Sequence, residues 1–147
     1  MPVDVVTEIE IARPRLEVAK YAANPDNATA WYENIEHVDW PQAERPLAVG
    51  SKMGFVAAFL GRKLSYTYEV REHEPGRKLV MSTSDGPFPM ETTYVWEDAG
   101  AGTRMTLGNR GEPSGFSKVA GPMMAAAMRR ANRKDLARLK AILEGRT

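Results

Sequence analysis

A change in hydrophobic period at about residue 120 limits the possible folds of this chain more than any other feature of its sequence. Between Ser51 and about Arg110, apolar residues alternate with polar or small ones, which is the period of strands with one buried face. Between Pro122 and Leu143, apolar residues recur with the period of a helix, and no glycine or proline follows Pro122 within the segment. The pattern predicts a sheet of short strands covered by one long amphipathic helix. The residues expected on the buried face of this helix are Met124, Ala127, Met128, Ala131, Leu139 and Ile142, with Leu136 and Leu143 on its flank.

Five strands are predicted in the alternating region. Turn segments rich in glycine, proline and aspartate separate them, so consecutive strands can pair as antiparallel hairpins. Such a meander needs none of the long crossover connections of a parallel sheet. The alternating positions run through Met53 to Phe59, Leu64 to Val70, Leu79 to Thr83, Thr92 to Trp96 and Met105 to Asn109.

The N-terminal part adds a strand, two short helices and an extended segment. Alternation from Val3 to Ile11 predicts the first strand. A short helix is predicted from Arg13-Pro14 to Asn24-Pro25, a second from Asp26 to about Glu33, and an extended segment from Ile35 to Trp40. We therefore predict an α+β fold in one domain, residues 1–147, in which a curved antiparallel sheet of six or seven strands wraps around the C-terminal helix.

Composition excludes several classes of protein. With 43% hydrophobic and 27% charged residues, the 147-residue chain matches globular domains rather than disordered chains. Because cysteine is absent, a disulfide framework, a thiolate zinc site and a cysteine nucleophile are excluded. The apolar runs are too short to span a bilayer and the N-terminus has no basic, apolar leader, so we expect a cytoplasmic protein without a transmembrane segment. The two histidines, His37 and His73, lie on separate predicted strands and are expected to be surface or structural residues.

The C-terminal segment is basic, although the net charge is only +1. Residues 116–147 carry eight Lys or Arg and two Asp or Glu. A cluster of this kind can bind nucleic acid or an anionic membrane. No aromatic side chains interleave with it, so we favour a solvated helix face and expect no nucleic-acid partner. We also expect no metal site and no cofactor, because metal-ligand spacings and phosphate-binding loops are missing from the sequence.

The order of elements resembles the helix-grip superfamily, also called START-like or Bet v 1-like (SRPBCC), and within it the small proteins of polyketide cyclase/dehydrase type. The motifs that carry the resemblance are Gly86 to Thr92, Gly111 to Phe116 and Asp135 to Lys140. The resemblance covers essentially the whole chain and implies an elongated, mostly apolar cavity between the sheet and the long helix. Members use this cavity to bind lipids or polyketides, or to cyclise or dehydrate them, so the resemblance does not imply one chemistry.

Aromatic and methionine side chains on the expected inward faces are the candidate cavity lining. Methionine is flexible and polarizable, while buried tyrosine and tryptophan need hydrogen-bond partners, so the mixture suits a site that orients an apolar ligand. A filled hydrophobic core is the alternative interpretation. The candidates are Trp31, Phe55, Phe59, Tyr66, Tyr68, Met81, Tyr94, Trp96, Met105, Asn109, Met124 and Met128, with Phe88 and Phe116 expected at the mouth.

Polar residues on the inward faces do not form a convincing catalytic pair. Thr92 and Asn109 continue the inward positions of their strands, and each is expected to be a hydrogen-bonded structural residue. Asp135 lies near the centre of the apolar helix face, where a carboxylate must be paired or protonated. Arg138 could pair with it at the rim of the helix, or a small shift of the helix would bring Asp135 to water.

We predict that the protein binds a small hydrophobic ligand, such as an aromatic polyketide, a lipid or a sterol-like compound. The alternative is an enzyme of cyclase or dehydratase type that uses the same cavity. Candidates for proton transfer are Tyr66, Tyr68, Tyr94, Asn109 and Asp135, and no catalytic residue is assigned. A third possibility is an interaction protein that grips an apolar segment of a partner. The protein is expected to be a monomer or a homodimer.

Overall fold

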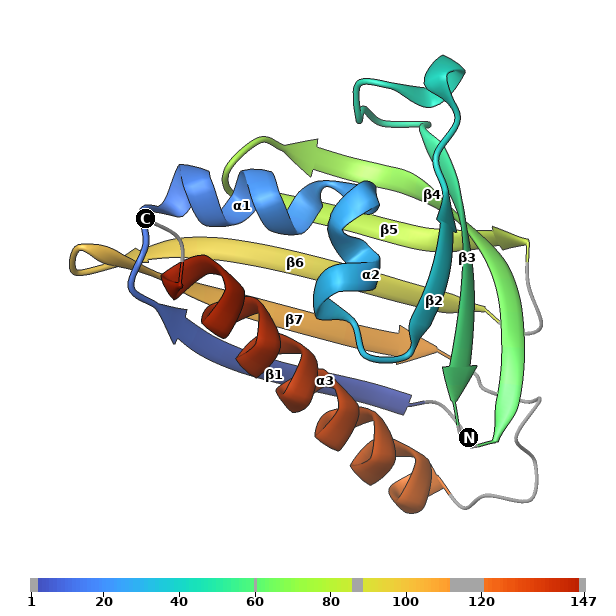
Figure 1. The fold of residues 1–147 in the computed structure, drawn as a ribbon. Coiled ribbons are helices and arrows are strands. Elements are labelled where there is room, and N and C mark those ends of the chain that lie inside the picture. The colour runs from blue at the N-terminus through green and yellow to red at the C-terminus, as the bar shows by residue number, and fades with distance from the viewer. Residues whose placement is uncertain (1–2, 60, 86–88, 112–120, 146–147) are drawn as a thin grey trace.

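The structure, a computed structural model, describes residues 3–59, 61–85, 89–111 and 121–145. Seven strands form one antiparallel sheet in the order β1-β7-β6-β5-β4-β3-β2. The predicted curved antiparallel sheet, with short helices after the first strand and a long C-terminal helix, is confirmed (Figure 1). The strands are β1 (Val3–Ile11), β2 (Ile35–Asp39), β3 (Lys52–Phe59), β4 (Arg62–Glu74), β5 (Lys78–Asp85), β6 (Met90–Ala99) and β7 (Gly102–Gly111).

The helical segments are α1 (Arg15–Ala23), the 3-10 turns η1 (Pro25–Asn27) and η2 (Gln42–Glu44), α2 (Ala28–Trp31) and α3 (Gly121–Glu144). The short helical stretch predicted from Asp26 to about Glu33 is present but ends at Trp31, and it consists of the 3-10 turn η1 followed by the single α-helical turn α2. The side chain of Asn24 accepts a hydrogen bond from the backbone nitrogen of Asp26, which starts η1. At Tyr32 the backbone turns extended, with φ −82° and ψ 119°, and this ends α2.

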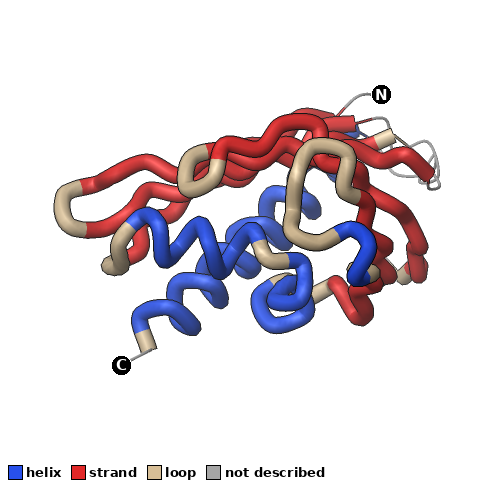
Figure 2. The backbone as a smooth tube through the Cα atoms, turned by 90° about the horizontal axis from the view of Figure 1, so that it is seen from above, coloured by secondary structure: helices blue, strands red, loops and turns tan. Residues whose placement is uncertain are grey.

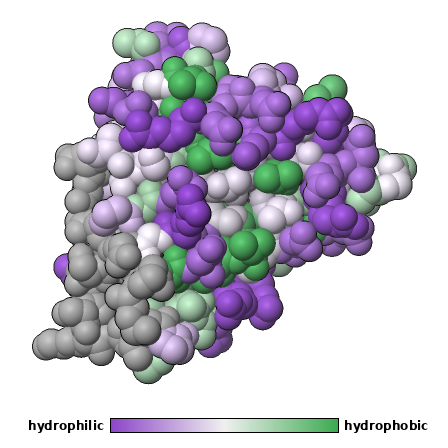
Figure 3. All heavy atoms as spheres, turned by 180° about the vertical axis from the view of Figure 1, so that it is seen from behind, coloured by the Kyte–Doolittle hydropathy of each residue, from purple (hydrophilic) through white to green (hydrophobic). Residues whose placement is uncertain are grey.

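All three α-helices lie on one side of the sheet (Figure 2). The opposite, outer face is mostly hydrophilic, with only scattered hydrophobic residues (Figure 3). Alternation along the strands explains this division, because successive side chains point to opposite faces of a sheet. In β1, for example, Val3 and Val5 are buried, whereas their neighbours Asp4 and Val6 are exposed.

The sheet bends strongly at β4, so that β2 and β3 run at a steep angle to β5, β6 and β7 (Figure 1). The pairing of β4 with β5 shifts register between Thr67 and Tyr68 and again between Val70 and Glu72. Such bulges bend a strand and increase its twist. The bend therefore turns the inward side chains of β3 and β4 toward α3 and creates a concave face.

The C-terminal half of α3 packs as solid core against this concave face. Leu136, Leu139 and Leu143 are fully buried. The Arg13 side chain donates a hydrogen bond to the carbonyl oxygen of Leu143 at 2.9 Å, and the Glu144 carboxylate accepts one from the backbone nitrogen of Ala12 at 2.8 Å. These bonds satisfy groups at a helix end that would otherwise lack partners, and they tie the end of α3 to the end of β1.

The buried face of α3 differs in part from the predicted one. Its centre lies on Leu136, Leu139 and Leu143, although Leu136 and Leu143 were expected on the flank. Ala127 and Ile142, which were expected inside, are only partly buried. The predicted helix from Pro122 to Leu143 is otherwise confirmed. Among the described residues, no helix is both long and apolar enough to cross a membrane.

Candidate functional site

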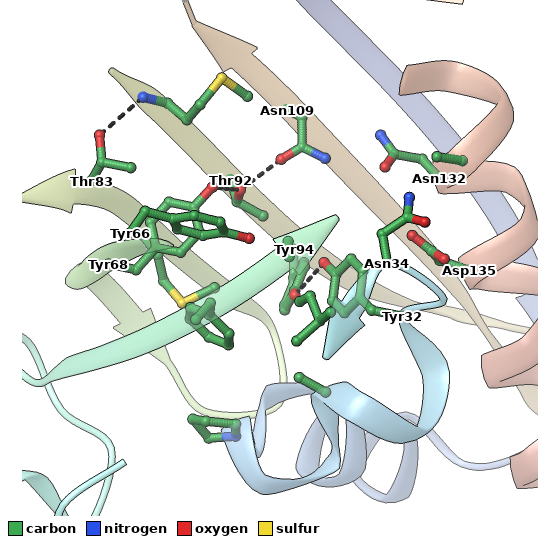
Figure 4. Close-up of a pocket in the computed structure, with 18 of the residues that line it drawn as sticks. Tyr32, Asn34, Tyr66, Tyr68, Thr83, Thr92, Tyr94, Asn109, Asn132 and Asp135 are labelled. Atoms are coloured by element: carbon green, nitrogen blue, oxygen red, sulfur yellow. Dashed lines mark hydrogen bonds between the residues drawn. The ribbon is translucent and has the colours of Figure 1, made fainter. Parts of the chain in front are cut away.

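A cavity of about 160 Å³ lies between the N-terminal half of α3 and the concave face of the sheet. Small residues create the space, because alanines occupy positions on four different elements around it. The cavity wall is formed by Ala22, Ala23, Asn24, Pro25, Ala28, Tyr32, Asn34, Ile35, Phe55, Ala57, Leu64, Tyr66, Tyr68, Met81, Thr83, Met90, Thr92, Tyr94, Asn109, Met124, Met128, Ala131, Asn132 and Asp135. The wall is mainly apolar, with a few polar groups that converge on the space (Figure 4).

The structure brings most of the predicted lining residues together. Eight of them line the cavity: Phe55, Tyr66, Tyr68, Met81, Tyr94, Asn109, Met124 and Met128. Trp31, Trp96 and Met105 are buried in the hydrophobic core and do not line the cavity. The side chains of Phe59, Phe88 and Phe116 lie outside the described residues, and so does most of the predicted mouth. Met90, two residues after Phe88, lines the cavity wall.

A chain of three hydrogen-bonded side chains crosses β4, β6 and β7. The hydroxyl of Thr92 donates to Oδ1 of Asn109 at 2.6 Å, and the hydroxyls of Tyr68 and Thr92 lie 2.7 Å apart. A threonine hydroxyl carries one hydrogen, which Thr92 uses on Asn109, so Tyr68 is the donor to Thr92. Burial raises the pKa of Tyr68 to about 12. The structural role expected for Thr92 and Asn109 fits this chain.

Tyr32 and Tyr94 form a second polar pair. Their hydroxyl oxygens lie 2.6 Å apart, and the Trp31 ring packs against both tyrosine rings. Burial raises the pKa of both hydroxyls well above the usual value for tyrosine. Both groups therefore stay protonated at neutral pH. For the Tyr66 hydroxyl, by contrast, the described residues offer no hydrogen-bond partner, although the ring stacks on Phe55.

Asp135 is a buried carboxylic acid on the α3 side of the cavity. Its side chain is 2% exposed, and Oδ1 accepts a hydrogen bond from the backbone nitrogen of Glu33 at 3.0 Å. Burial raises its pKa to about 6, while the Glu33 hydrogen bond and the positive charge of Arg138 oppose the rise. Asp135 lies inside, in agreement with its predicted place near the centre of the apolar helix face. It bonds to the backbone after α2, and among the described residues it forms no ion pair with Arg138. Arg138 is exposed.

The polar wall residues that were not predicted as site residues include Asn24, Tyr32, Asn34, Thr83 and Asn132. A signal for Asn132 was present in the sequence, since it stands four residues after Met128 and three before Asp135, on the same helix face. Nothing in the sequence pattern marked Tyr32 and Asn34, because they follow the unpredicted end of α2. His37 is exposed, His73 is half-buried, and neither lines the cavity.

The part of the chain that the structure describes contains no group of three or more His, Cys, Asp or Glu that could hold a metal ion. The described wall of the cavity offers a ligand hydrogen-bonding groups and apolar contacts. Its chemistry rests on tyrosine hydroxyls, asparagine amides and one carboxyl group whose pKa, about 6, lies well above that of a free aspartate.

Known structures with this fold come from several organisms. A START superfamily protein from Mycobacterium smegmatis is 15% identical, with 96% of this chain and 97% of that chain covered and a TM-score of 0.79. The Zhui aromatase/cyclase from Streptomyces sp. R1128 is also 15% identical, with 98% of this chain and 94% of that chain covered and a TM-score of 0.78. A protein from Thermus thermophilus is 20% identical over 95% of this chain and 98% of that chain, with a TM-score of 0.73. At such identities the likeness shows the fold alone.

No curated protein matches the chain at a significant level. Family membership is established by sequence over almost the full length. Residues 2–144 match the family described as "Polyketide cyclase / dehydrase and lipid transport", to which this chain therefore belongs.

Proposed function

We propose that the protein binds a small, mainly apolar molecule in the cavity beneath the N-terminal half of α3. The observation that carries the proposal is the cavity itself, a mostly apolar space of about 160 Å³ between the sheet and α3. Protein interiors are normally packed as densely as organic crystals, so a cavity of this size needs an explanation. Membership of a family that includes lipid transport supports a binding role.

The volume favours a ligand about the size of one aromatic ring with a short side chain. An engineered apolar cavity of about 150 Å³ in another protein binds benzene. Aromatic polyketides with several fused rings and sterol-like compounds are larger, and they would require the wall to move. Met81, Met90, Met124 and Met128 are the wall residues best able to do so, because methionine changes rotamer at little cost.

A cavity-filling substitution tests the proposal. Ala131 lines the cavity from α3, whereas Ala137 on the same helix is exposed. In calorimetric titrations with ethylbenzene, Ala131→Phe is expected to weaken binding at least about tenfold, because the new ring occupies the space. Ala137→Phe is the matched control and is expected to bind like the wild type. The proposal fails if the wild-type protein does not bind ethylbenzene, or if Ala131→Phe binds it unchanged.

A second candidate function is a cyclase or dehydratase reaction in the same cavity. The observation in its favour is Asp135, a cavity carboxyl group with a pKa of about 6, which suits proton transfer near neutral pH. With a linear poly-β-keto substrate, Asp135→Asn would lower turnover by about 10²–10⁴ and leave ethylbenzene affinity unchanged if the enzyme hypothesis holds. Native mass spectrometry of the freshly purified protein, with a search for a retained molecule, would identify the natural ligand class.

A further inference from the structure

Asn132 carries a buried hydrogen-bond donor that the fold does not use. The residue is 5% exposed, it lines the cavity, and its Nδ2 atom has no partner among the described residues. Nearly all buried polar groups in native proteins are hydrogen-bonded, so an unpaired amide donor against a cavity calls for an explanation. A ligand atom that accepts a hydrogen bond would satisfy it.

Asp135 places an acceptor on the same side of the cavity. It stands three residues after Asn132, so the two side chains share one face of α3. One carboxylate oxygen accepts the bond from Glu33, and no described residue donates to the other oxygen, Oδ2. Asn34, Asn132 and Asp135 lie together beside α3 (Figure 4). This side of the cavity therefore offers a donor and an acceptor together.

The remaining polar groups of the cavity are mostly engaged with one another. Tyr32 bonds to Tyr94, and Tyr68 to Thr92, which in turn bonds to Asn109. Tyr66 has a hydroxyl without a described partner, but its ring enters the cavity from β4, whereas Asn132 and Asp135 both come from α3 (Figure 4). The α3 side is therefore the place where a ligand gains most from a polar group.

We propose that Asn132 and Asp135 form a subsite for the hydroxyl group of a phenol or alcohol. The Asn132 amide donates to the hydroxyl oxygen, and the hydroxyl donates its hydrogen to the Asp135 carboxylate. A single hydroxyl group fits both partners, because it donates and accepts at one atom. A ligand carboxylate fits poorly, because its charge would meet the charge of Asp135 in a poorly solvated space. This inference rests on the proposed binding function and narrows its ligand class.

Three matched probes distinguish the contribution of the subsite from that of the apolar cavity: ethylbenzene, 4-ethylphenol and 4-ethylbenzoate. Titrations are made calorimetrically at about pH 8, roughly two units above the pKa of Asp135. We expect 4-ethylphenol to bind about fivefold to tenfold more tightly than ethylbenzene, and 4-ethylbenzoate to bind more weakly than ethylbenzene. Equal affinities for 4-ethylphenol and ethylbenzene, or a preference for 4-ethylbenzoate, would overturn the subsite.

Variants then assign the preference to residues. Asn132→Leu removes the donor with little change in volume, and it is expected to abolish the preference for 4-ethylphenol while ethylbenzene still binds. Asn132→Ala serves the same purpose if the leucine variant does not fold. Arg133→Leu, at the exposed neighbour of Asn132 on α3, is the control and is expected to keep the preference. Tyr66→Phe removes a cavity hydroxyl that also lacks a described partner. If Tyr66→Phe removes the preference and the Asn132 variants keep it, the hydroxyl binds elsewhere and the proposal is wrong.

The two proposals fail in different ways in this experiment. If the wild-type protein does not bind ethylbenzene, the apolar cavity does not act as a binding site and the proposed function fails. If ethylbenzene binds and the hydroxyl group adds no affinity, only the subsite of Asn132 and Asp135 fails. The wild-type titrations alone make this distinction, so it does not depend on the folding of any variant.

Discussion

The carboxylate of Asp135 lies 3.0 Å from the backbone nitrogen of Glu33 and accepts its hydrogen bond, which connects α3 to the segment after α2. The bond holds Tyr32 and Asn34, the two neighbours of Glu33, at the cavity wall. A buried carboxyl group thus stabilises the wall of the space that it faces. It also costs stability when it ionises, because burial disfavours the charged form.

The Asp135→Asn variant is expected to be more stable than the wild type at neutral pH. The pKa of Asp135 is about 6 in the folded protein and 3.8 in the absence of structure, so the folded state holds the proton more tightly. Ionisation between about pH 4 and 6 therefore lowers wild-type stability as the pH rises, and the loss is complete above about pH 6. A difference of about two pKa units corresponds to about 3 kcal/mol, which is the upper bound for the gain.

Urea unfolding at a series of pH values checks this prediction. The asparagine side chain can still accept the bond from Glu33, so the variant loses the charge and keeps the contact. Glu144 titrates in both proteins. Because its pKa is lowered in the folded state, this group lowers the stability of both proteins equally as the pH falls. Subtracting the two curves isolates residue 135. Parallel curves between about pH 4 and 6 would show that Asp135 ionises freely in the folded protein.

Tyr68→Phe is expected to lower the free energy of unfolding by about 1 kcal/mol. The change removes the donor to Thr92 and leaves a buried threonine oxygen short of one bond. Tyr66→Phe is the matched control, because its hydroxyl has no partner among the described residues, and its effect should be below about 0.5 kcal/mol. Denaturant unfolding of both variants measures the contrast. Equal effects would mean that the chain from Tyr68 to Asn109 contributes nothing to stability.

Leu139→Ala is expected to destabilise the protein by about 2–5 kcal/mol. Leu139 is fully buried where α3 packs on the sheet, so truncation leaves a cavity in solid core. Leu16→Ala on α1 makes the same chemical change at a side chain that is 65% exposed, and it should change stability by less than about 0.5 kcal/mol. Thermal unfolding of the two variants compares them. A small loss for Leu139→Ala would place α3 away from the sheet.

Gly102→Ala and Gly54→Ala are expected to act in opposite directions. A Cβ atom at Gly102 would lie 2.5 Å from the backbone oxygen of Ile11, so the pairing of β1 with β7 must shift, at a cost of about 1–3 kcal/mol. At Gly54 the nearest atom, Cβ of Asp39, would lie at 3.7 Å. Alanine fits there and restricts the unfolded chain, which stabilises by up to about 1 kcal/mol. Chemical unfolding measures the change in stability for both variants. If Gly102→Ala left the stability unchanged, the close approach of Gly102 to the Ile11 backbone would be contradicted.

The elements that could be predicted best are those with long, regular patterns. The first strand was predicted from Val3 to Ile11 and is found there, and the C-terminal helix differs from its predicted ends by one residue at each end. Short segments were predicted less well. The stretch after Pro25 splits into η1 and α2 because a side-chain bond from Asn24 and the extended backbone at Tyr32 override the local helical pattern.

The residue patterns predicted the candidate site as a set of inward-facing residues, whereas a cavity was expected only from the family resemblance. Tyr94 and Trp96 occupy equivalent inward positions two residues apart on β6, yet only Tyr94 reaches the cavity. Trp96 lies farther along the strand, in the hydrophobic core beside Met105, its partner on β7. The sequence pattern within β6 does not distinguish Tyr94 from Trp96, because the difference comes from the side chains of other elements that face each residue.

Residue patterns alone predict the order of the strands and helices and which face of most of them is apolar. This information is local, since the period of apolar residues specifies the buried side of an element without reference to its neighbours. The position of the cavity and the directions of the Asn132 and Asp135 side chains depend on how the elements pack in three dimensions. A cavity depends on the distance between α3 and a sheet bent at β4, and on the sizes of side chains from elements far apart in the chain.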